Sequence, residues 1–167
     1  TNDINGINGH KGKVREGFTL PKTARSNSIE SFRLVGNSIG YPFMAKGVIN
    51  NFTGTPTVVS NKNQIPYIWE FYDSHGFEAI ISKKFISGEE FSVAGICDRN
   101  NELKAHLSIK KLLKCEAGNT WAARKVSLPK LENDIKNLLK EIKWVGPIEL
   151  EFIRDNLDEE FKLIEIN

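Results

Sequence analysis

The sequence predicts an α+β fold, because helical and strand patterns follow one another irregularly instead of repeating as strand–helix–strand units. The clearest helical signal is a set of five apolar residues at helical spacing: Leu131, Ile135, Leu138, Leu139 and Ile142. Residues 90–97 and 102–113 have strand patterns, and a turn-forming segment, 98–101, joins them. The chain has 167 residues, of which 40% are hydrophobic, so it can form one domain or two small lobes with buried cores.

The amino-terminal half begins with a segment, 1–16, that is rich in Gly, Asn and Lys. We expect this segment to be a flexible arm or the remnant of a preceding domain. A helix is predicted from Asn27 to about Ile39, with Asn27 as its cap, Glu30 reaching back and Gly40 ending it. The other elements expected in this half are a strand over 41–48, a turn-rich loop over 50–56, a strand at 58–59 and a helix over 66–76.

The carboxyl-terminal half is dominated by strand patterns. The elements expected here are strands over 79–86, 90–97 and 102–113, a loop containing Gly118 and Asn119, a helix over 131–142, and strands over 144–153 and 161–167. The tryptophans, Trp69, Trp121 and Trp144, are expected to pack in the core or between lobes.

Composition narrows the class of protein. The net charge of +2 gives no general attraction to nucleic acid or to membrane surfaces, and neither is expected as a partner. No apolar run approaches the ~20 residues of a membrane span. Cys97 and Cys115 lack metal-site spacing, which favours free thiols, with Cys97 buried, and a cytoplasmic location. The chain starts at Thr1 and stops directly after an apolar strand, which suggests a fragment of a longer protein with further domains.

Acidic residues recur on the last two predicted strands. Glu149 and Glu151 share one face of their strand, and Glu165 and Asn167 share one face of the next, because side chains repeat every two residues. If the strands pair, Glu151, Glu165 and Asn167 come together, and a cation would offset the repulsion between like charges. These hard oxygen donors suit Mg²⁺, with Mn²⁺ as an alternative. The other interpretation is a set of solvent-facing charges on an exposed sheet.

Lysines upstream suggest an anion site. Lys46 stands inside an apolar strand, where it needs an anionic partner unless it points to water from an edge strand. The extended segment 82–93 exposes backbone groups that could bind the edge of an adenine. Within it, Lys84 could meet a ring nitrogen or a phosphate, and Glu90 could accept hydrogen bonds from ribose hydroxyls. An ordinary hairpin with solvated charges explains this segment equally. Lys111 could touch phosphate or be solvated.

Three motifs, in this order, resemble the ATP-grasp superfamily, which includes D-alanine–D-alanine ligase, biotin carboxylase and the carbamoyl-phosphate synthetase large subunit. The motifs are Tyr41-Pro-Phe-Met-Ala-Lys46, the stretch over 83–94, and Gly146-Pro-Ile-Glu-Leu-Glu-Phe152 with Leu163-Ile-Glu-Ile-Asn167. The resemblance spans roughly residues 17–167. It implies two small α+β lobes, 17–82 and 83–167, with the nucleotide between them and the metal-binding strands in the second.

The resemblance also implies a role for each matching position. The Lys83 carbonyl and the Ile86 amide would bind the adenine edge, Lys84 would approach the ring or a phosphate, and Glu90 would bind the ribose. Lys46 would contact the α- or β-phosphate, Lys111 would serve as a basic catalytic residue, and Lys11 would match an early nucleotide-binding lysine. Glu151, Glu165 and Asn167 would hold the metal ions. The implied function is an ATP- and Mg²⁺-dependent ligase that activates a small-molecule carboxylate as an acyl phosphate for attack by an amine or another nucleophile.

Some features depart from that pattern. Lys83 stands where an acidic residue is common, the phosphate-covering loop over 50–55 has one glycine, and no Pro-Arg pair follows Asn167. The family also places another domain before the two lobes. These departures keep three alternatives open: a non-catalytic or regulatory ATP-binding module, a part of a split carbamoyl-phosphate-synthetase-like enzyme, and an α+β interaction domain that binds no nucleotide.

Overall fold

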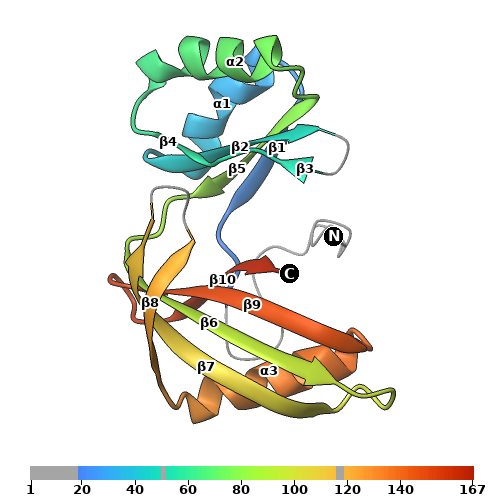
Figure 1. Cartoon of the computed structure of the whole chain (residues 1–167). Helices are drawn as coiled ribbons and strands as arrows, with labels where there is room; N and C mark the ends of the chain where they lie inside the picture. Colours follow the sequence, from blue (N-terminus) through green and yellow to red (C-terminus); the bar gives the residue numbers. More distant parts are fainter. Residues whose placement is uncertain (1–18, 50–51, 116–118) are drawn as a thin grey trace. The chain divides into compact units, whose positions relative to one another are not determined.

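The computed structural model describes residues 19–49, 52–115 and 119–167 (Figure 1). The described chain forms two compact units. The amino-terminal unit comprises residues 21–85, and the carboxyl-terminal unit comprises residues 86–167 together with Thr19 and Leu20. Each unit has a hydrophobic core beside an antiparallel sheet, so the predicted α+β class is confirmed. The predicted arm over 1–16 and Lys11 lie outside the described residues.

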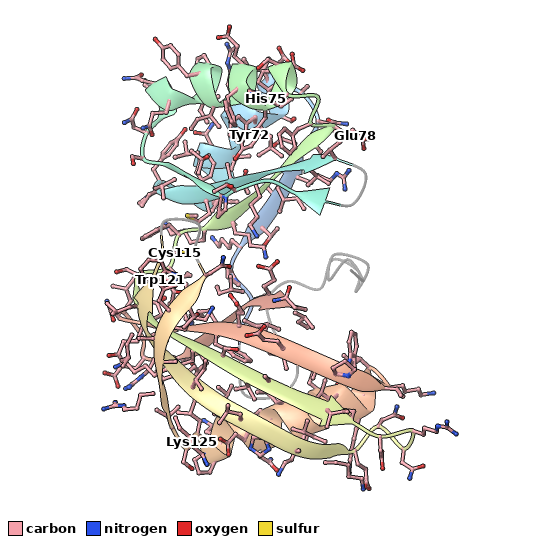
Figure 2. All side chains as sticks on the ribbon, in the orientation of Figure 1. Tyr72, His75, Glu78, Cys115, Trp121 and Lys125 are labelled. Atoms are coloured by element: carbon pink, nitrogen blue, oxygen red, sulfur yellow. The ribbon has the colours of Figure 1, made fainter. Side chains whose placement is uncertain are left out.

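The amino-terminal unit has a five-stranded sheet in the order β1-β5-β2-β3, with β4 also pairing with β2. Its strands are β1 (Thr23–Ser26), β2 (Phe43–Ile49), β3 (Phe52–Thr53), β4 (Thr57–Val59) and β5 (Ala79–Lys84). Helices α1 (Ile29–Ile39) and α2 (Ile65–Ser74) cover one face of this sheet (Figure 1). Tyr72 of α2, labelled in Figure 2, is buried, and its hydroxyl donates to the Ala45 carbonyl of β2 at 3.0 Å.

The start of α1 differs from the prediction by one residue. Ser28, not Asn27, is the cap: its backbone is extended, and its hydroxyl accepts the Ser31 N–H at 3.2 Å. The Ser31 hydroxyl in turn accepts the Ser28 N–H at 3.2 Å. Ser31 therefore completes the reciprocal pair that was expected of Glu30. Gly40 ends the helix as predicted, with a φ of 81°.

The carboxyl-terminal unit has a second five-stranded sheet, in the order β10-β9-β6-β7-β8, with every neighbouring pair antiparallel. Its strands are β6 (Gly88–Cys97), β7 (Leu103–Lys114), β8 (Thr120–Lys125), β9 (Gly146–Asp155) and β10 (Phe161–Ile166). Helix α3 (Pro129–Glu141) packs on one face of the sheet, where Ile135 and Leu139 are fully buried (Figure 1).

Two expectations for this unit are wrong. The stretch around 120–125 forms an edge strand, β8, which pairs only with β7 within the described sheet, although no strand was predicted there. Most of its side chains are exposed, so it lacks the apolar alternation that reveals a strand. Trp121 lies on this strand and is 78% exposed (Figure 2), so it does not pack in a core. Trp69 and Trp144 do pack against the cores of their units.

Two further expectations concern the chain between elements. Strand β5 ends at Lys84, so Ile86 lies beyond the strand that was predicted to contain it. The loop expected over 50–56 is described only from residue 52 and contains the short strand β3. Among the described residues, no helix is both long enough and apolar enough to cross a membrane.

Candidate functional site

The carboxyl-terminal sheet has one apolar face and one polar face. Phe91, Val93 and Leu150 point toward α3 and are buried in the core. Because side chains alternate along a strand, the residues between them point the other way. We call this second surface the polar face; it carries Glu90, Ser92, Lys111, Glu149, Glu151 and Glu165.

A carboxylate pair lies on the last two strands of the polar face. Glu165 of β10 is the direct register partner of Glu151 of β9. This pairing depends on a β-bulge between Leu163 and Glu165. Without the bulge, the register set by Leu163 opposite Phe152 would turn Glu165 toward the core, since a one-residue slip moves a side chain to the other face. The bulge therefore brings the two predicted metal ligands onto one face.

The third predicted ligand, Asn167, continues this ladder. Its N–H donates to the Glu149 carbonyl at 2.8 Å, and its carbonyl accepts the Glu149 N–H at 3.0 Å. The Glu149 carboxylate accepts the buried Ser92 hydroxyl at 2.5 Å. The described residues contain no group of three His, Cys, Asp or Glu side chains arranged to hold a metal. The predicted set instead combines two carboxylates with an amide, which is a hard-oxygen donor set compatible with Mg²⁺.

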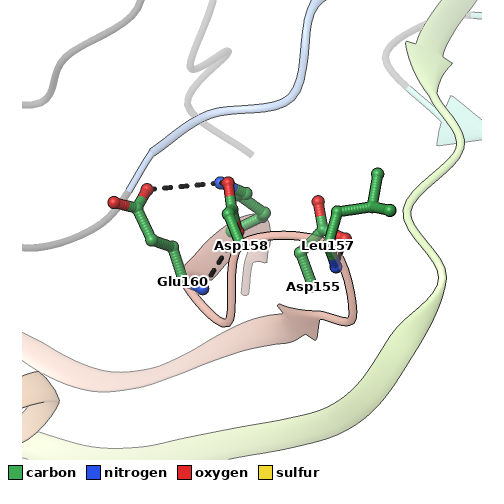
Figure 3. Close-up of polar contacts among 5 residues, drawn as sticks. Asp155, Leu157, Asp158 and Glu160 are labelled. Carbon is green, nitrogen blue, oxygen red and sulfur yellow. Dashed lines mark hydrogen bonds and ion pairs between the residues drawn. The ribbon is translucent and has the colours of Figure 1, made fainter.

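A turn stabilised by polar contacts joins β9 to β10 (Figure 3). Lys162 is buried and donates to Asp158 at 2.5 Å and to Glu160 at 3.3 Å. Burial alone would lower the pKa of Lys162, but its hydrogen bonds to these two carboxylates outweigh burial and raise it. The Asp155 carboxylate accepts the Leu157 N–H at 3.0 Å. These contacts fix the hairpin from which the opposed carboxylates project.

Lys111 lies beside the carboxylate pair. Its ammonium is 2.8 Å from the Glu151 carboxylate. Its side chain is only 6% exposed, whereas that of Glu151 is 30% exposed. Lys111 comes from β7 and Glu151 from β9, so the side chains meet across the intervening strand β6. The predicted basic residue thus contacts a predicted metal ligand directly.

Glu90, which was predicted to bind ribose, lines a cavity of about 190 Å³. The other lining residues come from the ends of β6 and β7: Gly88, Glu89, Lys110, Lys111, Leu112 and Lys114. Glu90 forms an ion pair with Lys114, and Glu89 forms one with Lys110. The hydrogen bond from Lys110 lowers the pKa of Glu89. The cavity therefore has both cationic donors and carboxylate acceptors on its walls.

Three other predicted residues lie in the amino-terminal unit. Lys46 is on β2 opposite Ile81, and Lys83 is on β5 opposite Met44, so both belong to the sheet face that α1 and α2 leave uncovered. Lys84 is the register partner of the core residue Phe43, so Lys84 belongs to the sheet face that α1 and α2 cover. The backbone N–H of Lys84 donates to the Lys22 carbonyl at 2.8 Å.

Ile86 belongs to the carboxyl-terminal unit. It is half-buried in the segment between β5 and β6. Lys83, whose carbonyl was expected to act with the Ile86 amide, lies within β5 of the amino-terminal unit.

Comparison with solved structures shows the fold. The N5-carboxyaminoimidazole synthetase of Staphylococcus aureus complexed with ADP matches with a TM-score of 0.70 and 15% identity, over 90% of this chain and 39% of that chain. Biotin carboxylase from Campylobacter jejuni matches with a TM-score of 0.70 and 18% identity, over 89% of this chain and 36% of that chain. The RiPP-associated ATP-grasp ligase of Chryseobacterium gregarium, in complex with ADP and a leader and core peptide, matches with a TM-score of 0.61 and 16% identity, over 90% of this chain and 47% of that chain.

The chain has the ATP-grasp fold. The resemblance inferred from the three sequence motifs is confirmed at the level of fold. No protein-family model and no curated protein sequence matches the chain. The chain spans 36–47% of the three solved chains described above, so it corresponds to less than half of each.

Within the ATP-grasp fold, sequence reasoning overlooked two features of the polar face. One is the Ser92–Glu149 hydrogen bond, which joins residues 57 positions apart. The other is the bulge in β10, because the sequence around it is apolar and shows no glycine to mark an irregularity. The alternation that placed Glu149 with Glu151 was visible in the sequence, but the register between strands was not.

Proposed function

We propose that this chain binds Mg²⁺·ATP and forms the nucleotide-binding part of a ligase that activates a carboxylate as an acyl phosphate. The observation that carries this proposal is the pair of opposed carboxylates, Glu151 and Glu165, on adjacent strands of an ATP-grasp fold. The Lys111 ammonium lies 2.8 Å from Glu151. The solved structure from Staphylococcus aureus is a complex with ADP, which supports a nucleotide ligand.

Glu151, Glu165 and Asn167 would hold Mg²⁺ or Mn²⁺, because their carboxylate and amide oxygens are the hard donors that these ions prefer. When bound, the ion would neutralise charge on the phosphate oxygens. The short Ser92–Glu149 hydrogen bond and the reciprocal backbone bonds between Glu149 and Asn167 would keep this end of the hairpin in place.

The nucleotide contacts follow from the matching positions. Glu90 would accept the ribose hydroxyls, and the Lys83 carbonyl with the Ile86 amide would bind the adenine edge. Lys84 would meet a ring nitrogen or a phosphate. Lys46 and Lys111 would act as compact positive charges on the phosphates, which is the usual role of lysine in phosphate binding.

The reaction would proceed in two displacements. An oxygen of the substrate carboxylate attacks the γ-phosphorus, the bond to the bridging oxygen breaks, and ADP leaves with the electron pair. The amine nitrogen then attacks the carbonyl carbon of the acyl phosphate, an amide forms, inorganic phosphate leaves, and the amine proton passes to solvent. Phosphoryl transfer depends mainly on positioning and electrostatics, so the lysines contribute by orienting and neutralising the phosphates. The partners of the proposed ligase would be the small-molecule carboxylate and amine substrates and further domains of a longer chain.

Two measurements on the same preparation test this proposal. Millimolar Mg²⁺·ATP should raise the melting temperature, because a ligand that binds only the native state stabilises it, by about 2.7 kcal/mol at a hundred times its Kd. A panel of carboxylates and amines should then include a pair that makes inorganic phosphate release depend on both compounds. The absence of any stabilisation by Mg²⁺·ATP would contradict the proposal and favour an interaction domain.

A second candidate function is an ATP-binding module without ligase activity. The feature that favours it is the segment over 50–55, which has one glycine where the resemblance implies a glycine-rich phosphate-covering loop. The same two measurements separate the candidates. Stabilisation by Mg²⁺·ATP with no carboxylate-dependent phosphate release would support the module.

A further inference from the structure

The ion pair between Lys111 and Glu151 engages one oxygen of a carboxylate that would bind the metal ion. The Lys111 ammonium lies 2.8 Å from Oε1 of Glu151. An ammonium and a divalent cation that share this carboxylate repel each other, because charges about 4 Å apart interact appreciably even at an effective dielectric constant of about 20. We infer that Lys111 stands in for the cation when no nucleotide is bound, and so makes binding of the free metal ion depend on nucleotide. This inference deepens the proposed function and rests on it.

Burial makes this ion pair more than a surface contact. The Lys111 side chain is 6% exposed, so its ammonium has little access to water. A buried ammonium is costly unless an anion and hydrogen bonds compensate it. Glu151 supplies that anion in this structure. A cation that binds Glu151 without nucleotide therefore withdraws part of the negative charge that compensates the Lys111 ammonium.

The neighbouring charges show why Lys111 acts on Glu151 in particular. Glu149, two residues earlier on the same face, accepts a neutral hydroxyl from Ser92. Lys110 and Lys114 form ion pairs with Glu89 and Glu90. Among the described lysines of this cavity, Lys111 is thus the one whose ammonium contacts a proposed metal ligand.

Nucleotide reverses the effect of Lys111. The phosphates of ATP carry negative charge. They give the Lys111 ammonium a new anionic partner, so that the Glu151 carboxylate can bind the metal ion. The same lysine therefore opposes binding of the cation alone and favours binding of the cation with ATP. Because opposite charges at about 4 Å interact appreciably even at an effective dielectric constant of about 20, both effects should be measurable.

The experiment compares Mn²⁺ binding by the wild-type chain and by Lys111→Met, with free Mn²⁺ measured by electron paramagnetic resonance. In the absence of ATP, we expect Lys111→Met to bind Mn²⁺ about tenfold more tightly than wild type. In the presence of ATP, we expect it to bind Mn²⁺·ATP about tenfold more weakly. The matched control is Lys110→Met, which removes the same charge from the adjacent residue, whose partner is Glu89. We expect wild-type Mn²⁺ affinity from it.

Two further variants keep the test decisive. Lys111→Gln repeats the measurement with a polar side chain in case the methionine variant does not fold, as judged by circular dichroism. In a Glu151→Gln background, Lys111→Met should give no gain in Mn²⁺ affinity, because the carboxylate for which Lys111 and the metal ion compete has been removed. Unchanged or weaker Mn²⁺ binding by the Lys111 variants, or an equal gain in Lys110→Met, would overturn the inference.

The outcomes also separate this inference from the proposed function. If wild type binds Mn²⁺·ATP and the Lys111 variants bind free Mn²⁺ no more tightly, the inference fails and the proposed function stands. If wild type does not bind Mn²⁺·ATP while the Lys111 variants gain affinity for free Mn²⁺, the lysine does block the cation but the proposed function fails.

Discussion

At the scale of single residues, Glu132 shows how one carboxylate ties helix α3 to the sheet. One of its oxygens accepts the buried Ser108 hydroxyl at 2.7 Å and the Leu128 N–H at 3.1 Å, and the other lies 3.5 Å from Nε2 of His106. Burial opposes ionisation of Glu132, but the hydrogen bonds from Ser108, Leu128 and His106 outweigh burial and lower the pKa of this carboxyl. Glu132 therefore anchors the start of α3 as an ion.

This arrangement predicts a pH-dependent loss in Glu132→Ala. Because the folded-state pKa is lowered, the stability that Glu132 contributes is present above the unfolded-state pKa of about 4.3 and is lost as the pH falls through the folded-state value. We expect the free energy of unfolding at about pH 7 to fall by about 2 kcal/mol, and the difference from wild type to shrink toward about pH 3. Urea unfolding at both pH values measures this, with the exposed Glu141→Ala as control. An equal loss at both pH values would contradict the account.

At the scale of elements, capping and core packing explain where the helices form. The reciprocal hydrogen bonds between Ser28 and Ser31 fix the first turn of α1, and the exposed side chain of Asn27 lies just before it. Helix α3 has no side-chain hydrogen bond from its cap residue, Leu128. It is held by its buried apolar stripe and by Glu132, consistent with the rule that tertiary packing supplies most helix stability.

The cap of α1 can be tested by two neighbouring substitutions. Ser28→Ala removes the hydroxyl that accepts the Ser31 N–H and should lower the free energy of unfolding by about 1 kcal/mol. Asn27→Ala should change it by less than about 0.5 kcal/mol, because Asn27 is exposed and lies outside the capping pair. Chemical denaturation measures both. A larger loss of unfolding free energy in Asn27→Ala than in Ser28→Ala would show that Asn27, and not Ser28, caps α1.

The buried stripe of α3 gives a second prediction for an element. Ile135 is fully buried between α3 and the sheet, so Ile135→Ala should cost about 3 kcal/mol through lost contacts and a cavity. Lys136, the next residue, is exposed, and Lys136→Ala should change stability by less than about 0.5 kcal/mol. Equal effects of the two substitutions on the unfolding midpoint would show that α3 does not pack as described.

At the scale of the whole molecule, local patterns were enough to predict the α+β class and the α-helices of the described residues, because buried faces repeat at 3.6 residues in helices and capping residues mark helix ends. Strand β8 escaped prediction because an exposed edge strand needs no apolar face. The motifs were enough to predict the ATP-grasp fold. Two features that shape the candidate site were not predictable: the bulge in β10 and the contact of Lys111 with Glu151, 40 residues apart. Both depend on register between strands, which local patterns do not encode.

The central claim is that Glu151 and Glu165 act together on the metal ion of Mg²⁺·ATP. Calorimetric titration of Glu151→Gln, Glu165→Gln and the double variant tests this most directly, with Glu141→Gln on α3 as the charge-matched control. We expect each single variant to lose at least about tenfold in Mg²⁺·ATP affinity, and the double variant to lose little more, because residues that share one partner are not additive. Wild-type affinity in both single variants, or losses that simply multiply in the double variant, would contradict a shared metal ion.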